Sequence, residues 1–149
     1  MFRRLDIKLI HFFRRISIPL ARFGLFVVFF WFGALKVIDL SPASPLVEKL
    51  FNETISFLSF PTFLVLFGLF ECLIGILFLI RGTERVVIPL LFIHMVTTVM
   101  PLFLLPEATW SAAMVPTLEG QYIIKNILII AVAITIAAHL HPLPRAKSS

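Results

Sequence analysis

Residues 61–80 read PTFLVLFGLFECLIGILFLI and contain a single charged side chain, that of Glu71. A helix rises about 1.5 Å per residue, so about 20 such residues reach across the roughly 30 Å hydrocarbon core of a bilayer. Pro61 suits the opening turn of a helix. The segment therefore predicts a transmembrane helix, and it decides the class of the whole chain.

The composition of the whole chain supports the same class. Of 149 residues, 60% are hydrophobic, 14% are charged and 17 are phenylalanine. A soluble domain carries about 25% charged residues, so most of this surface is expected to face lipid. The length suits one membrane domain, residues 1–149. No basic patch interleaved with aromatic residues is visible in a soluble segment, so we expect no nucleic-acid partner.

Three further apolar segments resemble the first. Residues 18–38, 86–105 and 121–140 are each about 20 residues long and predict transmembrane helices. Pro89 and Pro101 lie within the third of these four spans and are expected to kink it. The sequence thus predicts an all-α membrane protein, a bundle of four transmembrane helices.

Two amphipathic segments accompany the spans. Residues 2–16 carry six apolar side chains at helical spacing and basic side chains between them, which predicts a helix lying in the headgroup region. This helix could act only as a topology anchor, or it could bind anionic lipid or a partner. Residues 45–59 predict a short helix on the outer surface. The run after the basic segment is longer than a secretory signal core, so we expect it to be retained.

The basic residues are distributed unevenly between the two sides that four spans create. One side holds Arg3, Arg4, Lys8, Arg14, Arg15, Arg81, Arg85, Arg145 and Lys147. The other side holds Lys49 and, at the span edges, Lys36 and Lys125. Cytoplasmic loops carry the excess of Lys and Arg, so nine residues against three predict that both termini are cytoplasmic.

A few polar residues within the spans are the candidates for function. They are Arg22, Lys36, Glu71, His94, Lys125 and Asn126. A charge at the centre of a membrane helix costs at least about 2.5–3.5 kcal/mol, so such residues are rare without a role. Gly68 and Gly75 flank Glu71 on one helical face, and small residues mark helix–helix contacts. We therefore expect Glu71 to point into the bundle, where either lysine could pair with it.

Two interpretations of this polar cluster stay open. It could bind a ligand headgroup or carry protons, or a Glu71–Lys pair could only fix the packing. The lysines could also extend to the outer interface. His94 and His139 are too far apart in depth for bis-histidine haem ligation, and no zinc-ligand spacing or catalytic triad is visible. Cys72, the single cysteine, is expected to be a packing residue.

Several motifs resemble those of a known family. They are Ala21-Arg22-Phe23-Gly24, Trp31-Phe32-Gly33-Ala34-Leu35-Lys36, Ser44-Pro45-Leu46, Gly68-Leu69-Phe70-Glu71-Cys72, Thr97-Thr98, Pro106-Glu107-Ala108-Thr109-Trp110 and Gln121-Tyr122-Ile123-Ile124-Lys125-Asn126. In this order they resemble the DoxX-like membrane proteins, nearest the YkgB branch, over about residues 16–140. The segment between the first two spans is shorter here than in that branch.

The resemblance implies a four-helix bundle in the bacterial inner membrane, with Arg22, Lys36, Glu71 and Lys125 as family residues. It implies a small subunit or accessory factor of quinone-linked redox chemistry or oxidative-stress defence, with quinone as a candidate cofactor. An oxidoreductase subunit or a second copy of the chain would be the protein partner. The alternatives are a non-enzymatic scaffold and a small transporter of protons, ions or metabolites, since intramembrane ionisable groups can relay protons.

Overall fold

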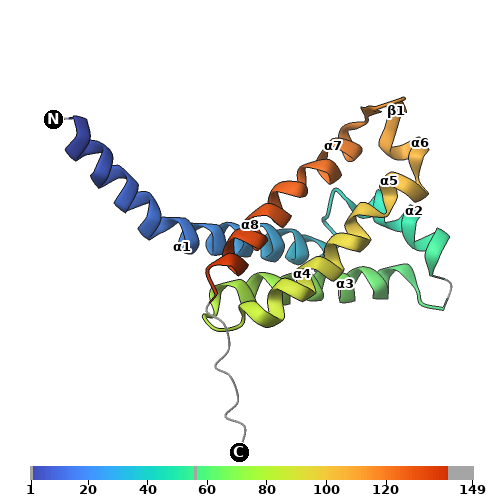
Figure 1. The fold of residues 1–149 in the computed structure, drawn as a ribbon. Helices are drawn as coiled ribbons and strands as arrows, with labels where there is room; N and C mark the ends of the chain where they lie inside the picture. The colour runs from blue at the N-terminus through green and yellow to red at the C-terminus, as the bar shows by residue number, and fades with distance from the viewer. Residues whose placement is uncertain (1, 56, 141–149) are drawn as a thin grey trace, which may run out of the picture.

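The computed structural model describes residues 2–55 and 57–140 (Figure 1). In chain order the elements are α1 (Phe2–Val37), α2 (Ser44–Thr54), α3 (Phe60–Leu79), α4 (Glu84–Val99), α5 (Pro101–Leu104), α6 (Pro106–Thr109), β1 (Trp110–Ala112), β2 (Val115–Pro116), α7 (Leu118–Lys125) and α8 (Ile127–Ala138). Four helical segments are long and apolar enough to cross a membrane: Arg3–Val37, Phe60–Leu79, Glu84–Leu104 and Leu118–Ala138. The predicted four-span helical architecture is confirmed at this level.

The first span differs from its prediction. A separate helix over residues 2–16 and a span over residues 18–38 were expected, whereas α1 continues through both as one helix of 36 residues. Pro19 lies inside it, and a proline removes only one backbone donor and crowds the preceding turn, which bends a helix without ending it. Figure 1 shows α1 changing direction before the stretch that packs beside α3. Residues 3–15 are exposed, and we call residues 3–16 the N-terminal arm.

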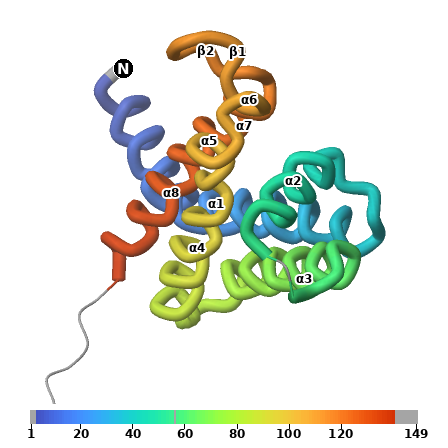
Figure 2. The backbone as a smooth tube through the Cα atoms, turned by 90° about the vertical axis from the view of Figure 1, so that its right-hand side faces the viewer, coloured from blue at the N-terminus to red at the C-terminus, as the bar shows by residue number. Residues whose placement is uncertain are grey.

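Among the described residues, the most extensive helix–helix contact is that of α1 with α3, which run side by side (Figures 1 and 2). A Cβ atom on Gly33 would lie 2.6 Å from the carbonyl oxygen of Gly68, and a Cβ on Gly68 would lie 2.6 Å from that of Gly33. Glycine is therefore required on both helices. Cys72 fills the same contact, with its Sγ 3.6 Å from the carbonyl oxygen of Phe30. The predicted helix–helix face of α3 is confirmed.

The hydrophobic core lies among α1, α3, α4 and α8. Its buried members are Leu25, Phe29, Ile74, Phe78, Val87, Ile88, Leu91, Met95, Ala133 and Ile136. Apolar side chains also cover the outside of the helices, including Ile93 and Leu128. This distribution is what a helix bundle surrounded by lipid shows, because the solvent on its outside is as apolar as its core.

The connection between α3 and α4 is short and internally bonded. Gly82 adopts a φ of 93°, a left-handed conformation that glycine tolerates without steric cost. The hydroxyl of Thr83 donates towards the carbonyl oxygens of Leu77 and Ile80, at 2.5 and 2.7 Å. These bonds satisfy carbonyls at the end of α3. Helix α4 begins at Glu84, two residues before the predicted start of the span at residue 86.

The opposite end of the bundle contains structure that the sequence did not predict. Helix α2 ends at Thr54 instead of residue 59, because Ile55 is extended. Strands β1 and β2 pair as an antiparallel hairpin, so the chain is not strictly all-α. Thr117 caps α7 by accepting a hydrogen bond from the Gly120 amide. The last span therefore begins at Leu118, before the predicted residue 121, and it ends at Ala138.

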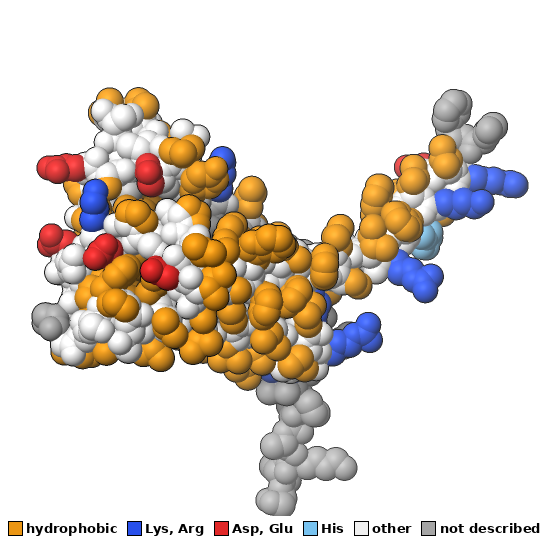
Figure 3. Space-filling view, turned by 180° about the vertical axis from the view of Figure 1, so that it is seen from behind, with side chains coloured by type: hydrophobic (Ala, Val, Ile, Leu, Met, Phe, Trp, Pro, Cys, Tyr) orange, Lys and Arg blue, Asp and Glu red, His pale blue; other side chains and the backbone are white. Residues whose placement is uncertain are grey.

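The two ends of the bundle differ in charge. The arm, the α3–α4 connection and the end of α8 lie at one end, while α2, α6 and the hairpin lie at the other (Figure 1). Figure 3 shows acidic side chains gathered at the end far from the arm, and basic side chains along the arm. The predicted separation of basic residues holds for the described ones. Arg145 and Lys147 lie outside the described residues.

A buried lysine–glutamate–histidine network

Three helices each contribute one ionisable side chain to a single buried network. Lys36 lies at the end of α1, Glu71 in the middle of α3 and His94 in α4. The three residues are only 5%, 5% and 4% exposed. Lys36 is at the level of Gly68, where a Cβ would lie 2.9 Å from the Cβ of Lys36. The lysine stem therefore runs one helical turn along α3 to reach Glu71.

Glu71 is the hub of the network. The Lys36 Nζ donates to its Oε2 at 2.6 Å, and the His94 Nε2 lies 2.8 Å from its Oε1. The Thr98 hydroxyl lies 3.2 Å from the His94 Nδ1. The Thr98 hydroxyl also donates to the carbonyl oxygen of His94 at 3.0 Å, so this threonine contacts both the ring and the backbone of the histidine. Lys36 and Glu71 form an ion pair within the network.

Phenylalanine rings enclose the network. Phe67 stacks on the His94 imidazole, with centroids 5.1 Å apart and planes 9° apart. Phe29 meets the same ring edge-on at 5.3 Å, and the Lys36 Nζ lies 5.6 Å from the Phe67 centroid. Ion pairs strengthen in an apolar surrounding, but desolvation is repaid only when each charge keeps a partner. Here both carboxylate oxygens of Glu71 and both ring nitrogens of His94 have a polar partner.

Arg22 belongs to a second polar site. Its Nη1 donates to Glu84 Oε1, and its Nη2 donates to the carbonyl oxygen of Ile80 at 2.6 Å. Arg22 precedes Lys36 by 14 positions, so the two sites are about 21 Å apart along α1. Glu84 was not among the site residues predicted from the sequence. The sequence did contain a signal for this pair, because Glu84 stands at the start of one span and Arg22 near the same end of another.

We expect Arg22→Gln to lower the free energy of unfolding by about 1.5–3 kcal/mol, the usual range for hydrogen bonds to charged groups. Glutamine cannot span both the Glu84 carboxylate and the Ile80 carbonyl. Arg14→Gln on the exposed arm is the matched control and should change it little. The measurement is unfolding by dodecyl sulfate in mixed micelles. Equal effects from the two variants would contradict the assignment.

The other two predicted site residues do not join the network. Lys125 is exposed, and its Nζ lies 5.0 Å from the centroid of the Tyr122 ring. Asn126 is half-buried at the junction of α7 and α8. Lys36, and not Lys125, is therefore the partner of Glu71. The predicted cluster of six residues divides into the network, the Arg22–Glu84 pair and this outer segment.

An apolar layer separates the network from the Arg22–Glu84 pair. Phe29 of α1, Phe78 of α3 and Leu91 of α4 lie between the two sites in sequence and are 4%, 0% and 0% exposed. They belong to the same buried core. The network is thus closed towards the end of the bundle that carries the N-terminal arm.

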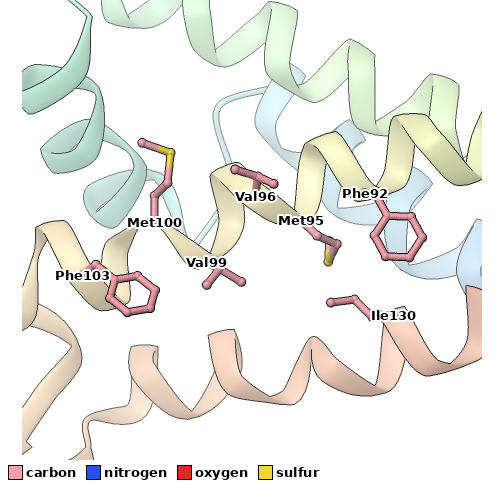
Figure 4. Close-up of a pocket in the computed structure, with 7 residues that line it drawn as sticks. All are labelled: Phe92, Met95, Val96, Val99, Met100, Phe103 and Ile130. Carbon is pink, nitrogen blue, oxygen red and sulfur yellow. The ribbon is translucent and has the colours of Figure 1, made fainter.

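An open groove runs between α4–α5 and α8 (Figure 4). Its volume is about 400 Å³, and it is lined by Phe92, Met95, Val96, Val99, Met100, Phe103 and Ile130. All seven side chains are apolar. His94 and Thr98 lie on the opposite face of α4 by helical spacing. The groove therefore opens away from the network.

No family model, no curated protein and no solved structure matches this chain, so the likeness to the DoxX-like proteins rests on the motifs quoted above.

Proposed function

We propose that this chain is a DoxX-like accessory subunit of the bacterial inner membrane that serves quinone-linked redox chemistry or oxidative-stress defence. The observation that carries the proposal is that the Lys36–Glu71–His94 network is buried and that its polar groups are bonded to one another. Its groups bond to one another and lie beneath aromatic rings. Such a network locks α1, α3 and α4 together and leaves the redox chemistry to a quinone or to a partner subunit.

In this proposal the basic end of the bundle faces the cytoplasm, with both termini on that side. The support is the excess of Lys and Arg in the arm and in the α3–α4 connection, because positively charged loops stay on the cytoplasmic side. The acidic side chains of α2, α6 and α7 would then face the outside. An inner-membrane location follows from the family resemblance.

Transport of protons or ions is the less supported alternative. A route across the membrane would have to connect the network with the Arg22–Glu84 pair. The layer of Phe29, Phe78 and Leu91 lies between them and contains no polar side chain. A scaffold that carries no quinone remains the second candidate, and it shares the same structural role for the network.

The apolar groove is the place that suits the quinone of this proposal. An isoprenoid chain needs an apolar surface open to the bilayer, and the groove between α4–α5 and α8 offers one at membrane depth. Asn126 precedes Ile130 by four residues, which places it on the same side of the last span. Its amide is half-buried and could donate a hydrogen bond to a quinone carbonyl.

We expect protein purified from bacterial membranes in mild detergent to retain stoichiometric isoprenoid quinone. The measurement is mass spectrometry of its organic extract. Val99→Trp should lower the retained quinone at least about tenfold, because filling the groove should cost at least about 1.4 kcal/mol of binding free energy. The larger indole would occupy the space between Val99 and Ile130.

The matched control is Ile93→Trp, on the same helix but at a position 59% exposed and outside the groove. It should retain quinone as the unmodified chain does. Extracts containing only bulk phospholipid would overturn the quinone part of the proposal and favour the scaffold. Loss of quinone from both variants would contradict the placement in the groove.

A further inference from the structure

The N-terminal arm has two chemically different faces. Leu5, Leu9, Phe12 and Phe13 follow one helical face, and Phe12 and Phe13 are 54% and 58% exposed. The opposite face carries Arg3, Arg4, Lys8, Arg14 and Arg15, all exposed. Asp6 is the single acidic residue of the arm. Within the described part of the chain nothing covers this apolar face, and covering it would remove unfavourable contact between apolar side chains and water.

The basic and apolar faces of the arm point in different directions relative to the bundle. In Figure 3 the arm projects from the bundle, with Lys and Arg along the edge turned away from it. Hydrophobic side chains lie along the other edge, which faces back towards the level of the spans. The bend of α1, a helix that contains Pro19, produces this arrangement, because the arm leaves the direction that α1 takes beside α3 (Figure 1).

We propose that the N-terminal arm binds the surface of an anionic phospholipid leaflet, with its apolar face in the acyl boundary and its five basic side chains among the lipid phosphates. The charge of the arm complements such a surface, and its amphipathic pattern suits the boundary between headgroups and acyl chains. A soluble acidic protein would satisfy only the basic face. A second arm would bring five like charges together, which opposes association.

The base of the arm is held at the depth that this binding needs. Arg22 follows the arm by six positions and is bonded to Ile80 and Glu84 at the α3–α4 connection. The arm therefore begins at the level of that connection, where Arg81 adds a further basic side chain to the same end of the protein. Every copy of the chain that is inserted in a membrane has the bilayer surface beside it at the depth of the α3–α4 connection.

The test uses the full chain with Cys72→Ala and Leu9→Cys, labelled on the arm with an environment-sensitive fluorophore. Nanodiscs of phosphatidylcholine alone are compared with nanodiscs that also contain phosphatidylglycerol. The emission should shift to the blue in the anionic discs and return towards the red at high salt, because salt screens exposed charges. Replacing all five basic residues by Gln should lower the ratio of docked to undocked arm about three-thousandfold, since each residue contributes about fivefold.

The matched control replaces only the four arginines of the arm by Lys, which keeps the charge and should keep the lipid-dependent shift. Equal spectra in the two kinds of disc would overturn the proposal. So would a shift that follows the number of protein copies per disc and not the phosphatidylglycerol content, because that outcome identifies a second copy as the partner. The proposal is independent of the quinone measurement, and either can fail alone.

Discussion

Replacing Glu71 with leucine is expected to lower the free energy of unfolding by about 3–5 kcal/mol, the range for breaking a buried ion pair from one side. The substitution leaves the Lys36 ammonium, 5% exposed, without its anion. It also removes the acceptor 2.8 Å from the His94 Nε2. Both groups sit beneath phenylalanine rings, so water cannot replace the lost partner without opening the packing. Unfolding by dodecyl sulfate in mixed micelles measures the change.

A second variant separates charge from shape. Glu71→Gln combined with Lys36→Met removes both charges, while the amide oxygen can still accept from His94. We expect the double variant to recover most of the stability lost in Glu71→Leu, because an apolar replacement of a buried ion pair is often neutral. A double variant as unstable as Glu71→Leu would show that the loss comes from packing and not from an unpaired charge.

Gly33→Ala is expected to lower the free energy of unfolding by about 3 kcal/mol, at the upper end of the range for overpacking. The added Cβ would lie 2.6 Å from the Gly68 carbonyl oxygen and 2.8 Å from the Cys72 amide nitrogen. These are backbone atoms, which cannot rotate away, so α1 and α3 must separate. Separation also moves Lys36 from Glu71. Maleimide labelling of Cys72 should become faster, because the thiol lies at the contact that opens.

Gly24→Ala provides the control on the same helix. A Cβ on Gly24 meets nothing within 4 Å, and alanine is favoured over glycine in helices by about 0.5–1 kcal/mol. This variant should therefore be as stable as the unmodified chain or slightly more stable, with unchanged labelling of Cys72. Destabilisation equal to that of Gly33→Ala would contradict the close contact of α1 with α3.

The features that the sequence predicted correctly are those set by local pattern. The four spans follow from runs of apolar residues, because the cost of placing polar groups in lipid is a property of each segment alone. Glu71 was expected inside the bundle because Gly68 and Gly75 share its helical face, and the structure confirms that position. Three predictions were wrong. Helix α1 was predicted as two separate helices, and α2 was predicted to be longer than it is. The β1–β2 hairpin was not predicted, since strands of three and two residues carry no periodicity.

The partners of the charges are what the tertiary structure alone decided. From the sequence, Lys36 and Lys125 were equal candidates for Glu71, and Arg22 had no partner. The choice depends on how deep each helix sits and how it is rotated against its neighbours. The contact of Gly33 with Gly68 fixes that register for α1 and α3, which brings Lys36 within 2.6 Å of Glu71. Hydropathy determines that a helix enters the membrane, but the register between helices is a property of pairs of helices.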